Sequence, residues 1–410
     1  METDEETDDI RGVVEAFVRQ QVALGVLPYA TIVEETGYHF QDEANRDVVR
    51  RWAGEVTARE LAAHLAAQAE FPGPTDSDRL TLAFRALDSA GIVAREDFTC
   101  CQNCGVQEIR DEADERDQRR GYTFYHQQDA ERGVEGGGVY LAYGLFDGPA
   151  TVEIGEEVAA ALRDHDLPVR WDGSTGTRIF VPLTLRRRRF GRLAAVPPVV
   201  EDDIPVEVAV PDAWRGPFAL TDGTLAASWL TGLHLPWLPV GIRVRVTVDG
   251  ASVTVRRDWD TLVGGFPDGT ELRVGRRDGM TLVRRLRGAT APAAEPTPEA
   301  GLVEATWQHP AGLQDRAVPL ETAEAVEMVR RMPVRTGAWI CYVGRSDAAV
   351  QMRWERGRLW LESPDPATET STGRHVSLPE AERMVRILAT EDRVAVNELV
   401  GVTTVSWRGN

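Results

Sequence analysis

Residues 92–105 read Ile92-Val-Ala-Arg-Glu-Asp-Phe-Thr-Cys-Cys-Gln-Asn-Cys-Gly105. The apolar start of this stretch predicts a strand from Ile92 to about Phe98, and three cysteines follow where that strand would end. A charged segment from Gly105 to Gln118 then predicts a helix. The stretch therefore indicates an α/β unit in which cysteines occupy the connection between the first strand and a helix.

The residues that follow continue the alternation of strands and helices. Strands are predicted at 122–125, 139–143, 169–171 and 178–181, and a helix is predicted at 154–162. Together these segments give the order β-α-β-β-α-β with one additional strand. Such an order is typical of a mixed sheet covered by helices.

The residues before this unit predict a helical lead-in. An apolar stripe from Ile10 to Val18, a segment after Pro28 and a segment from about Ser77 to Gly91 have helical spacing. Thr57-Ala-Arg-Glu60 has the form of a capping box, which predicts that another helix begins there. We therefore expect residues 1–185 to form a helical lead-in followed by the cysteine-containing α/β unit.

The region from 190 to 288 has a different pattern. It contains short alternating segments, among them 242–248 and 281–286, which predict strands. Asp-Gly dipeptides such as Asp249-Gly250 separate several of them and favour hairpin turns. Residues 190–288 are therefore predicted to form a β-rich domain.

The last part of the chain is predicted to be a linker and a C-terminal α/β domain. Residues 289–300 are rich in proline and alanine and predict an exposed linker. Within residues 301–410, Glu324-Ala-Val-Glu-Met-Val-Arg330 resembles Glu380-Ala-Glu-Arg-Met-Val-Arg386. This similarity suggests tandem β-α-β-β units, and chance similarity between two amphipathic helices is the alternative. The expected fold class of the whole chain is α+β.

Composition and charge narrow the possible partners and locations. The 410 residues carry a formal net charge of −19, which argues against nucleic acid and anionic membranes as partners. No apolar run is long enough to span a bilayer. The first residues are acidic where a secretory signal would be basic and then apolar, so a cytoplasmic location is expected.

All 46 basic residues are arginine. The absence of lysine excludes lysine Schiff bases, the lysine anchor of pyridoxal phosphate, and the lysines of P-loop and protein-kinase sites. The densest basic run, Arg186 to Arg189, is expected to pair with acidic side chains of neighbouring domains rather than to contact phosphates.

The cysteine stretch is the best candidate for a functional site. Cys101-Gln-Asn-Cys104 places two thiols on one side of a tight turn and Cys100 adds a third, a set that suits tetrahedral zinc. His126, at the end of a strand in the same expected sheet, would complete a set of four zinc ligands. Two alternatives stay open: redox chemistry by Cys101 and Cys104 at the start of a helix, and simple packing of small apolar side chains. No catalytic residue is assigned.

The motifs around the cysteines also carry a resemblance to a known family. They are Cys100-Cys-Gln-Asn-Cys-Gly105, Gly121-Tyr-Thr-Phe-Tyr-His-Gln-Gln-Asp129, Val139-Tyr-Leu-Ala-Tyr-Gly144 and Trp171-Asp-Gly173. Through them, residues 76–182 resemble an uncharacterised, mainly actinobacterial domain of unknown function, family 6891. The resemblance implies a domain but supplies no activity, ligand or partner.

Two functions are compatible with these features. The first is that of an adaptor that binds a protein partner, for instance in a defence or conflict system. The alternative is a metal- or thiol-dependent enzyme that uses the neighbourhood of Cys100 and His126. The sequence leaves open whether the protein is an enzyme and what its oligomeric state is.

Overall fold

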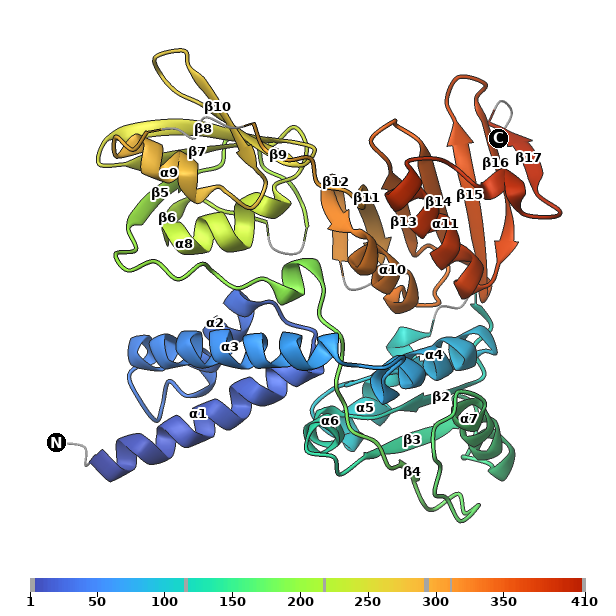
Figure 1. Ribbon diagram of the computed structural model, residues 1–410. Coiled ribbons are helices and arrows are strands. Elements are labelled where there is room, and N and C mark those ends of the chain that lie inside the picture. The colour runs from blue at the N-terminus through green and yellow to red at the C-terminus, as the bar shows by residue number, and fades with distance from the viewer. Residues whose placement is uncertain (1–3, 114–116, 217–218, 291–294, 310–311, 408–410) are drawn as a thin grey trace. The chain divides into compact units, whose positions relative to one another are not determined.

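The computed structural model describes residues 4–113, 117–216, 219–290, 295–309 and 312–407 (Figure 1). The chain divides into two units. Unit 1 consists of Met1–Arg189 with two short later segments, Pro333–Thr336 and Trp354–Arg358. Unit 2 consists of Phe190–Met332, Gly337–Arg353 and Leu359–Asn410.

Unit 1 begins with four helices. They are α1 (Asp4–Leu24), α2 (Tyr29–His39), α3 (Arg46–Ala69) and α4 (Asp76–Ser89). The side chain of Asn45 accepts hydrogen bonds from the first backbone N–H groups of α3, and Thr75 forms a capping box with Asp78 at α4. The prediction that a helix begins at Thr57 is wrong, because α3 already begins at Arg46 and Thr57 is buried inside it.

A four-stranded sheet follows these helices in unit 1. Its strands are β1 (Ile92–Arg95), β2 (Gly121–Phe124), β3 (Val139–Leu145) and β4 (Ile179–Val181), in the order β1-β2-β3-β4. The pair β1 and β2 is parallel, and the other two pairs are antiparallel. The expected mixed sheet is therefore present. Leu80, Ile92, Leu141 and Val158, from four different elements, share its hydrophobic core.

The connections of this sheet differ in part from the expectation. They contain α5 (Gln102–Glu108), a 3-10 turn (Ile109–Glu112), α6 (Gln127–Val134) and α7 (Val152–Asp164). The helix expected over 105–118 is thus shorter and starts earlier, and α6 was not expected. The strand expected at 169–171 is reduced to a single bridge between Arg170 and Phe180.

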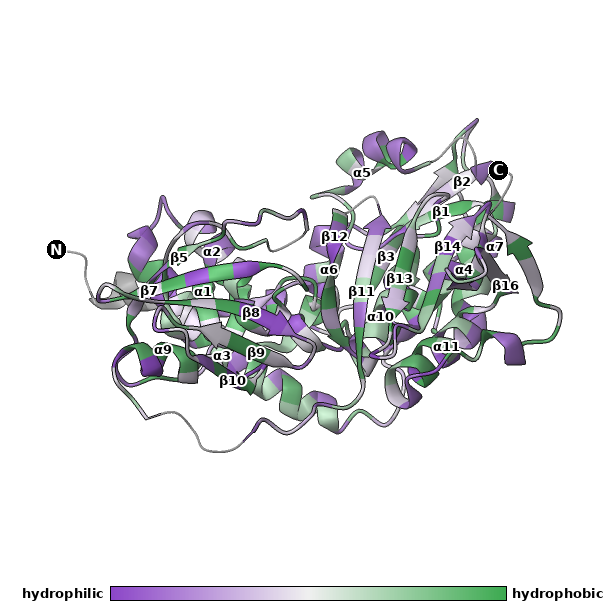
Figure 2. Ribbon diagram, turned by 90° about the horizontal axis from the view of Figure 1, so that it is seen from above, coloured by the Kyte–Doolittle hydropathy of each residue, from purple (hydrophilic) through white to green (hydrophobic). Residues whose placement is uncertain are grey.

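The first part of unit 2 is an antiparallel six-stranded sheet in the order β10-β9-β8-β7-β5-β6. The strands are β5 (Pro205–Ala209), β6 (Gly223–Ala226), β7 (Arg243–Val248), β8 (Ala251–Asp258), β9 (Thr261–Gly265) and β10 (Glu271–Gly275). Buried residues alternate with exposed or half-buried ones along β7 and β8. Figure 2 colours these strands by the hydropathy of their residues.

The turns and helices of this region agree with the sequence-based prediction in one place and differ from it in another. Asp249 and Gly250 both have positive φ, 48° and 81°, and form the expected two-residue turn between β7 and β8. The strand expected at 281–286 is wrong: this segment is helix α9 (Met280–Leu286). A short helical run also follows β6, comprising α8 (Ala227–Trp229), a π-turn (Leu230–His234) and a 3-10 turn (Leu235–Trp237).

The second part of unit 2 is a seven-stranded sheet in the order β12-β11-β13-β14-β15-β16-β17. The strands are β11 (Leu302–His309), β12 (Gly312–Glu321), β13 (Trp339–Val343), β14 (Ala349–Glu355), β15 (Arg358–Asp365), β16 (Thr370–Val376) and β17 (Thr403–Ser406). Helices α10 (Thr322–Arg331) and α11 (Leu378–Glu391) contact each other and both contact β11, so they lie on the same face of the sheet (Figure 1).

The internal similarity has a structural counterpart with a different order of elements. Each matching heptapeptide lies in a helix, and each helix follows a hairpin: β11-β12-α10-β13 and β15-β16-α11-β17. Arg330 of α10 donates two hydrogen bonds to the Glu382 carboxylate of α11, at 2.7 and 2.8 Å. The strand after α10 pairs with the first strand of its hairpin, whereas the strand after α11 pairs with the second, so the two halves are not copies in topology.

The expected linker at 289–300 falls partly on residues 291–294, which lie outside the described residues. The described part near its end is bonded to the rest of unit 2, because the Glu299 carboxylate accepts hydrogen bonds from Arg276 at 2.7 Å and the Glu299 N–H donates to Asp260 at 2.8 Å. Among the helices that the structure describes, none has the length and apolar character required to cross a membrane.

Candidate functional site

The three cysteines lie in the loop from β1 to α5 in unit 1. Cys101 is the residue that precedes α5, and Cys104 lies in its first turn. Two non-glycine residues of the approach, Asp97 and Thr99, have positive φ values of 50° and 61°. The Thr99 hydroxyl donates to the carbonyl oxygens of Phe98 and Cys101, at 2.6 and 3.1 Å. These local bonds hold an unusual backbone path that folds Cys100 back toward Cys104.

The sulfur atoms form a close group. One ligand atom from each of Cys100, Cys101 and Cys104 lies within 4.8 Å of the others, and the Cys100 thiol donates to Cys104 Sγ at 3.6 Å. The expectation that Cys101 and Cys104 lie within ligand reach of each other is confirmed. Tetrahedral zinc with Zn–S bonds of ~2.3 Å separates its sulfurs by about 3.8 Å, so small side-chain rotations would bring the group to that geometry.

The thiols differ in their affinity for protons. The backbone N–H of Cys104, together with the neighbouring thiols, stabilises the Cys101 thiolate and lowers the pKa of Cys101. Hydrogen bonds with Cys100 and Cys101 raise the pKa of Cys104 to about 11. Cys101 therefore ionises more readily than Cys104. Such a group can exchange its protons for a metal ion, whose positive charge stabilises all three thiolates.

His126 does not belong to this sulfur group. It precedes α6, and its Nε2 lies 3.0 Å from Asp129 Oδ2 and 3.2 Å from Arg178 Nη1. Its Nδ1 is buried without a hydrogen-bond partner among the described residues. Burial is the main cause that lowers the pKa of His126, which favours the neutral imidazole. In this conformation the imidazole is held by Asp129 and Arg178, and its role as a fourth ligand stays a prediction.

The loops that carry the cysteines and His126 are nevertheless joined through their backbones. Phe98 N–H donates to the Tyr125 carbonyl at 2.9 Å, and Gln127 N–H donates to the Thr99 carbonyl at 3.0 Å. These two bonds extend the pairing of β1 and β2 beyond the strands themselves. The residues on either side of His126 are therefore bonded to the backbone just before the cysteines.

Asp129 lies next to His126, and the sequence analysis did not assign it as a site residue. Its carboxylate is fully buried and accepts from Arg178 at 3.0 Å and from Arg132. Both guanidinium groups stack on the Tyr140 ring, at 4.6 and 4.9 Å from its centroid. The three-residue spacing of His126, Asp129 and Arg132 at the start of α6 was the available signal. Arg178 lies far along the chain and gave none.

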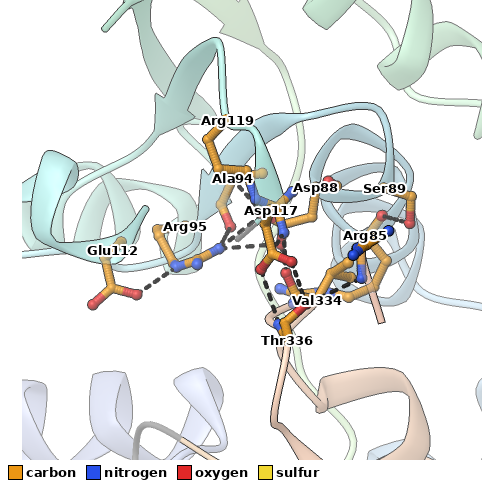
Figure 3. A network of polar contacts seen from close by, with 11 residues as sticks. Arg85, Asp88, Ser89, Ala94, Arg95, Glu112, Asp117, Arg119, Val334 and Thr336 are labelled. Carbon is orange, nitrogen blue, oxygen red and sulfur yellow. Dashed lines mark hydrogen bonds and ion pairs between the residues drawn. The ribbon is translucent and has the colours of Figure 1, made fainter. Parts of the chain in front are cut away.

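A second polar cluster of unit 1 lies beside β1 and includes residues of α4, of β1 and of the segment before β2 (Figure 3). Asp88, at the end of α4, is fully buried and accepts from the Ala94 N–H at 3.1 Å and from Arg95 Nη1 at 3.0 Å. Arg95 also donates to Glu112 at 2.8 Å. Arg85 Nη1 lies 3.3 Å from the other Asp88 oxygen. Each of these charged side chains therefore has an oppositely charged partner from the same unit.

The same cluster holds the segment Pro333–Thr336 against the rest of unit 1. Arg119 donates to the carbonyl oxygens of Asp88 and Val334. The Asp117 carboxylate accepts from the Thr336 N–H at 2.9 Å and from its hydroxyl. We call the set formed by these residues the Asp88 network; its members are Arg85, Asp88, Arg95, Glu112, Asp117, Arg119 and Thr336.

Two arginines of the run pair with acidic side chains as expected, but these partners lie in unit 1, to which the run itself belongs, and not in a neighbouring domain. Arg187 pairs with Glu96, and Arg188 lies 3.3 Å from Asp78 Oδ2. Arg189 is buried and donates to backbone carbonyls of the N-terminal helices, including that of Val22 at 2.9 Å. These side chains close unit 1 by bonding its last residues to its first helices.

Comparison with known protein families gives a match for this unit. Residues 6–189 match the model of a family described as a domain of unknown function (DUF6891). The match covers less than half of the chain and ends where the main segment of unit 1 ends. It begins well before residue 76, so the matched region includes the N-terminal helices, which were expected only to lead into the domain. No curated protein and no solved structure matches the chain.

Proposed function

We propose that this domain of unknown function, residues 6–189, binds a thiophilic metal ion, zinc in the first place, through Cys100, Cys101 and Cys104. The observation that carries the proposal is the convergence of three sulfur atoms within 4.8 Å on a loop of strained backbone. Thiolates are soft ligands, and a site with several of them favours zinc over magnesium or calcium. No other group of three metal-ligating side chains converges in this way in the described parts of the chain.

The position of the cluster favours an open site. Cys100 is exposed, and Cys101 and Cys104 are half-buried. A structural zinc site is usually closed by four protein ligands, whereas a site with three leaves a position for water or a substrate. Bound zinc would supply a Lewis acid and a water molecule of lowered pKa at that position. The proposal therefore includes the metal-dependent enzyme expected as an alternative from the sequence, with no further catalytic residue assigned.

The test is a zinc titration of the full-length protein, reduced and freed of metal, in competition with a chromophoric chelator. We expect one zinc ion per chain for the wild type. The variants Cys100→Ser, Cys101→Ser and Cys104→Ser should each bind more than roughly 100-fold more weakly, because loss of a second-shell partner alone can reach that size. Cys341→Ser is the matched control, since Cys341 is a half-buried cysteine of β13 in unit 2.

Two results would contradict the proposal. One is equal zinc binding by the wild type and the cysteine variants. The other is rapid, quantitative formation of a Cys100–Cys104 disulfide in a protein that binds no zinc, which would favour the redox alternative. The 3.6 Å between these sulfurs makes the second result a real competitor.

A second candidate function, binding of a protein partner, is favoured by strand β17. It is the last strand of the seven-stranded order, so its outer edge has no neighbouring strand among the described residues. All four of its residues are exposed, and Val405 and Trp407 expose 47% and 44% of their surface. An exposed edge with apolar side chains is a template for an added strand. We therefore propose, as the second candidate, that β17 binds a protein partner, which is the adaptor role in defence or conflict systems that the sequence suggested.

The partner that can be tested at once is a second copy of the chain. Sedimentation velocity should then show reversible dimers of the wild type and monomers of Val405→Lys, because an edge lysine opposes strand pairing. If the wild type stays monomeric at high concentration, two copies of the chain do not pair through β17, and such pairing cannot support the adaptor role.

A further inference from the structure

Unit 1 contains a cavity of about 730 Å³ that is separate from the cysteine cluster. It lies between α1, α2 and α6, and its walls include Phe17 and Gln20 of α1, Glu35 and His39 of α2, and Gln127 and Glu131 of α6. A volume of this order is typical of sites for small organic ligands. The zinc proposal makes no use of these residues, so the inference is independent of it.

One wall of the cavity is aromatic. The Phe17 and His39 rings stack with centroids 4.7 Å apart and an interplanar angle of 16°. Phe40 packs edge-on against both rings, at 5.8 and 4.7 Å. Because each ring is fixed by the other two, this wall presents rigid π surfaces with little entropy to lose when a ligand binds.

The same region already binds a cation through an aromatic ring. The guanidinium of Arg46 lies 3.6 Å from the ring centroid of Tyr38, another residue that lines the cavity. This is a cation–π contact made by the chain itself, and it is supported by the Glu34 carboxylate at 3.3 Å from Arg46 Nη2. At the cavity, a guanidinium of the chain is therefore already bound between an aromatic ring and a carboxylate.

The cavity itself has carboxylates without such a cation. Neither Glu35 nor Glu131 makes a side-chain hydrogen bond or an ion pair with another described residue. Glu35 is exposed to solvent, and partial burial of its carboxyl raises its pKa. Amide side chains of Gln20 and Gln127 add carbonyl oxygens that can accept hydrogen bonds.

We propose that this cavity binds a small organic cation with N–H donors, of the alkylguanidinium or alkylammonium class. The Phe17 and His39 rings would stack on the cation or its alkyl chain, and Glu35 and Glu131 would accept its hydrogen bonds. Carboxylates and amide oxygens require donors, so a guanidinium or a protonated amine fits better than a quaternary ammonium ion, which has none.

The test is isothermal titration calorimetry of the full-length protein with n-butylguanidinium and with 1,4-diaminobutane. Tetramethylammonium is the cation without donors, and butyrate is the anion of similar size. We expect saturable binding of at least one of the first two probes, binding at least about tenfold weaker for tetramethylammonium, and none for butyrate. Binding that does not discriminate between these probes, or no binding of either donor cation up to about 10 mM, would overturn the proposal.

Variants locate the site. Glu35→Gln and Glu131→Gln keep the shape of the side chain and should each weaken binding about tenfold, the effect of losing a charge-assisted hydrogen bond. Glu43→Gln is the matched control, because it removes the same charge from an exposed residue of unit 1 outside the cavity. Circular dichroism spectra that match the wild type show that the variants are folded. Unchanged affinity in both folded cavity variants would place any binding elsewhere and contradict the assignment.

Discussion

Beside β1, the Asp88 network joins seven side chains of unit 1 in ion pairs and hydrogen bonds. The three cysteines follow the end of the same strand, and the Cys100 thiol donates a hydrogen bond to another cysteine of the group. The two clusters are only a few residues apart in sequence. Asp88 is fully buried, but Cys100 is exposed. One cluster is closed to further partners by its own arginines, and the other keeps sulfur lone pairs at the surface.

This difference shows two roles of polar side chains in one domain: one cluster stabilises the fold, and the other is available to bind a ligand. Buried charges must be paired within the protein, because an unpaired charge in the interior costs several kcal/mol. The thiols are near the surface, where water tolerates them without a partner, and a metal ion can reach them. We therefore expect changes to the Asp88 network to alter stability and changes to the cysteines to alter binding.

The largest effect is expected for Asp88→Ala. The variant leaves the guanidinium of Arg95 with one carboxylate fewer and the Ala94 N–H without its acceptor. Breaking a buried ion pair in this way should lower the free energy of unfolding by about 3–5 kcal/mol. Urea denaturation measures the change. Asp147→Ala is the control with a change within about 0.5 kcal/mol, since Asp147 is 94% exposed and lies 3.5 Å from Arg110.

Zinc binding to the cysteine cluster should change the free energy of unfolding somewhat less than Asp88→Ala does. At a free zinc concentration 100 times the dissociation constant, the wild type should gain about 2.7 kcal/mol of stability. Cys101→Ser should gain nothing from zinc, while its stability without metal should stay within about 0.5 kcal/mol of the wild type. Thermal unfolding with and without zinc gives both values. A variant that loses much stability without metal would show that the thiol group is structural.

A milder change to the Asp88 network is Thr336→Val, which keeps the shape of the side chain. It removes the hydroxyl that donates to Asp117 and that accepts from the Arg356 N–H at 3.0 Å. We expect a loss of about 1–2 kcal/mol in urea denaturation. Thr224→Val, at an exposed threonine of β6, should have almost no effect. Equal losses in both variants would mean that the hydroxyl of Thr336 does not stabilise the fold.

The smallest expected effect is a difference in reactivity between the thiols. A lowered pKa gives Cys101 more thiolate at neutral pH, whereas Cys104, with a pKa of about 11, stays protonated. Iodoacetamide should therefore label Cys101 before Cys104 near pH 7, and the difference should shrink as the pH rises toward 11. Mass spectrometry of the peptides measures the order. Preferential labelling of Cys104 at neutral pH would contradict these pKa directions.

The parts of the fold that the sequence predicted are those set by local chemistry. The Asp249-Gly250 turn is an example, because its shape depends on the two residues that form it. The proximity of Cys100 and Cys104 is of the same kind, since four residues at the start of a helix bring two side chains to one side. Local signals suffice where the contact itself is local.

The errors arose where distant residues decide the structure. Thr57 and Glu60 have the spacing of a helix start, yet α3 runs through them because its Val49, Ala53 and Val56 are buried in the core. Residues 281–286 have a short apolar pattern that fits a strand or a helix equally well. The orientation of His126 is set by Arg178, 52 residues later in the chain, and no local pattern could show it.

The account rests most directly on the number of sulfur atoms around bound zinc. Zinc K-edge X-ray absorption of the full-length protein loaded with one equivalent of zinc counts them. We predict three sulfurs at ~2.3 Å and one nitrogen or oxygen at about 2.0–2.1 Å, the latter from water or from His126 after rotation of its side chain. A shell of nitrogen and oxygen without sulfur would contradict the assignment of Cys100, Cys101 and Cys104 as the metal site.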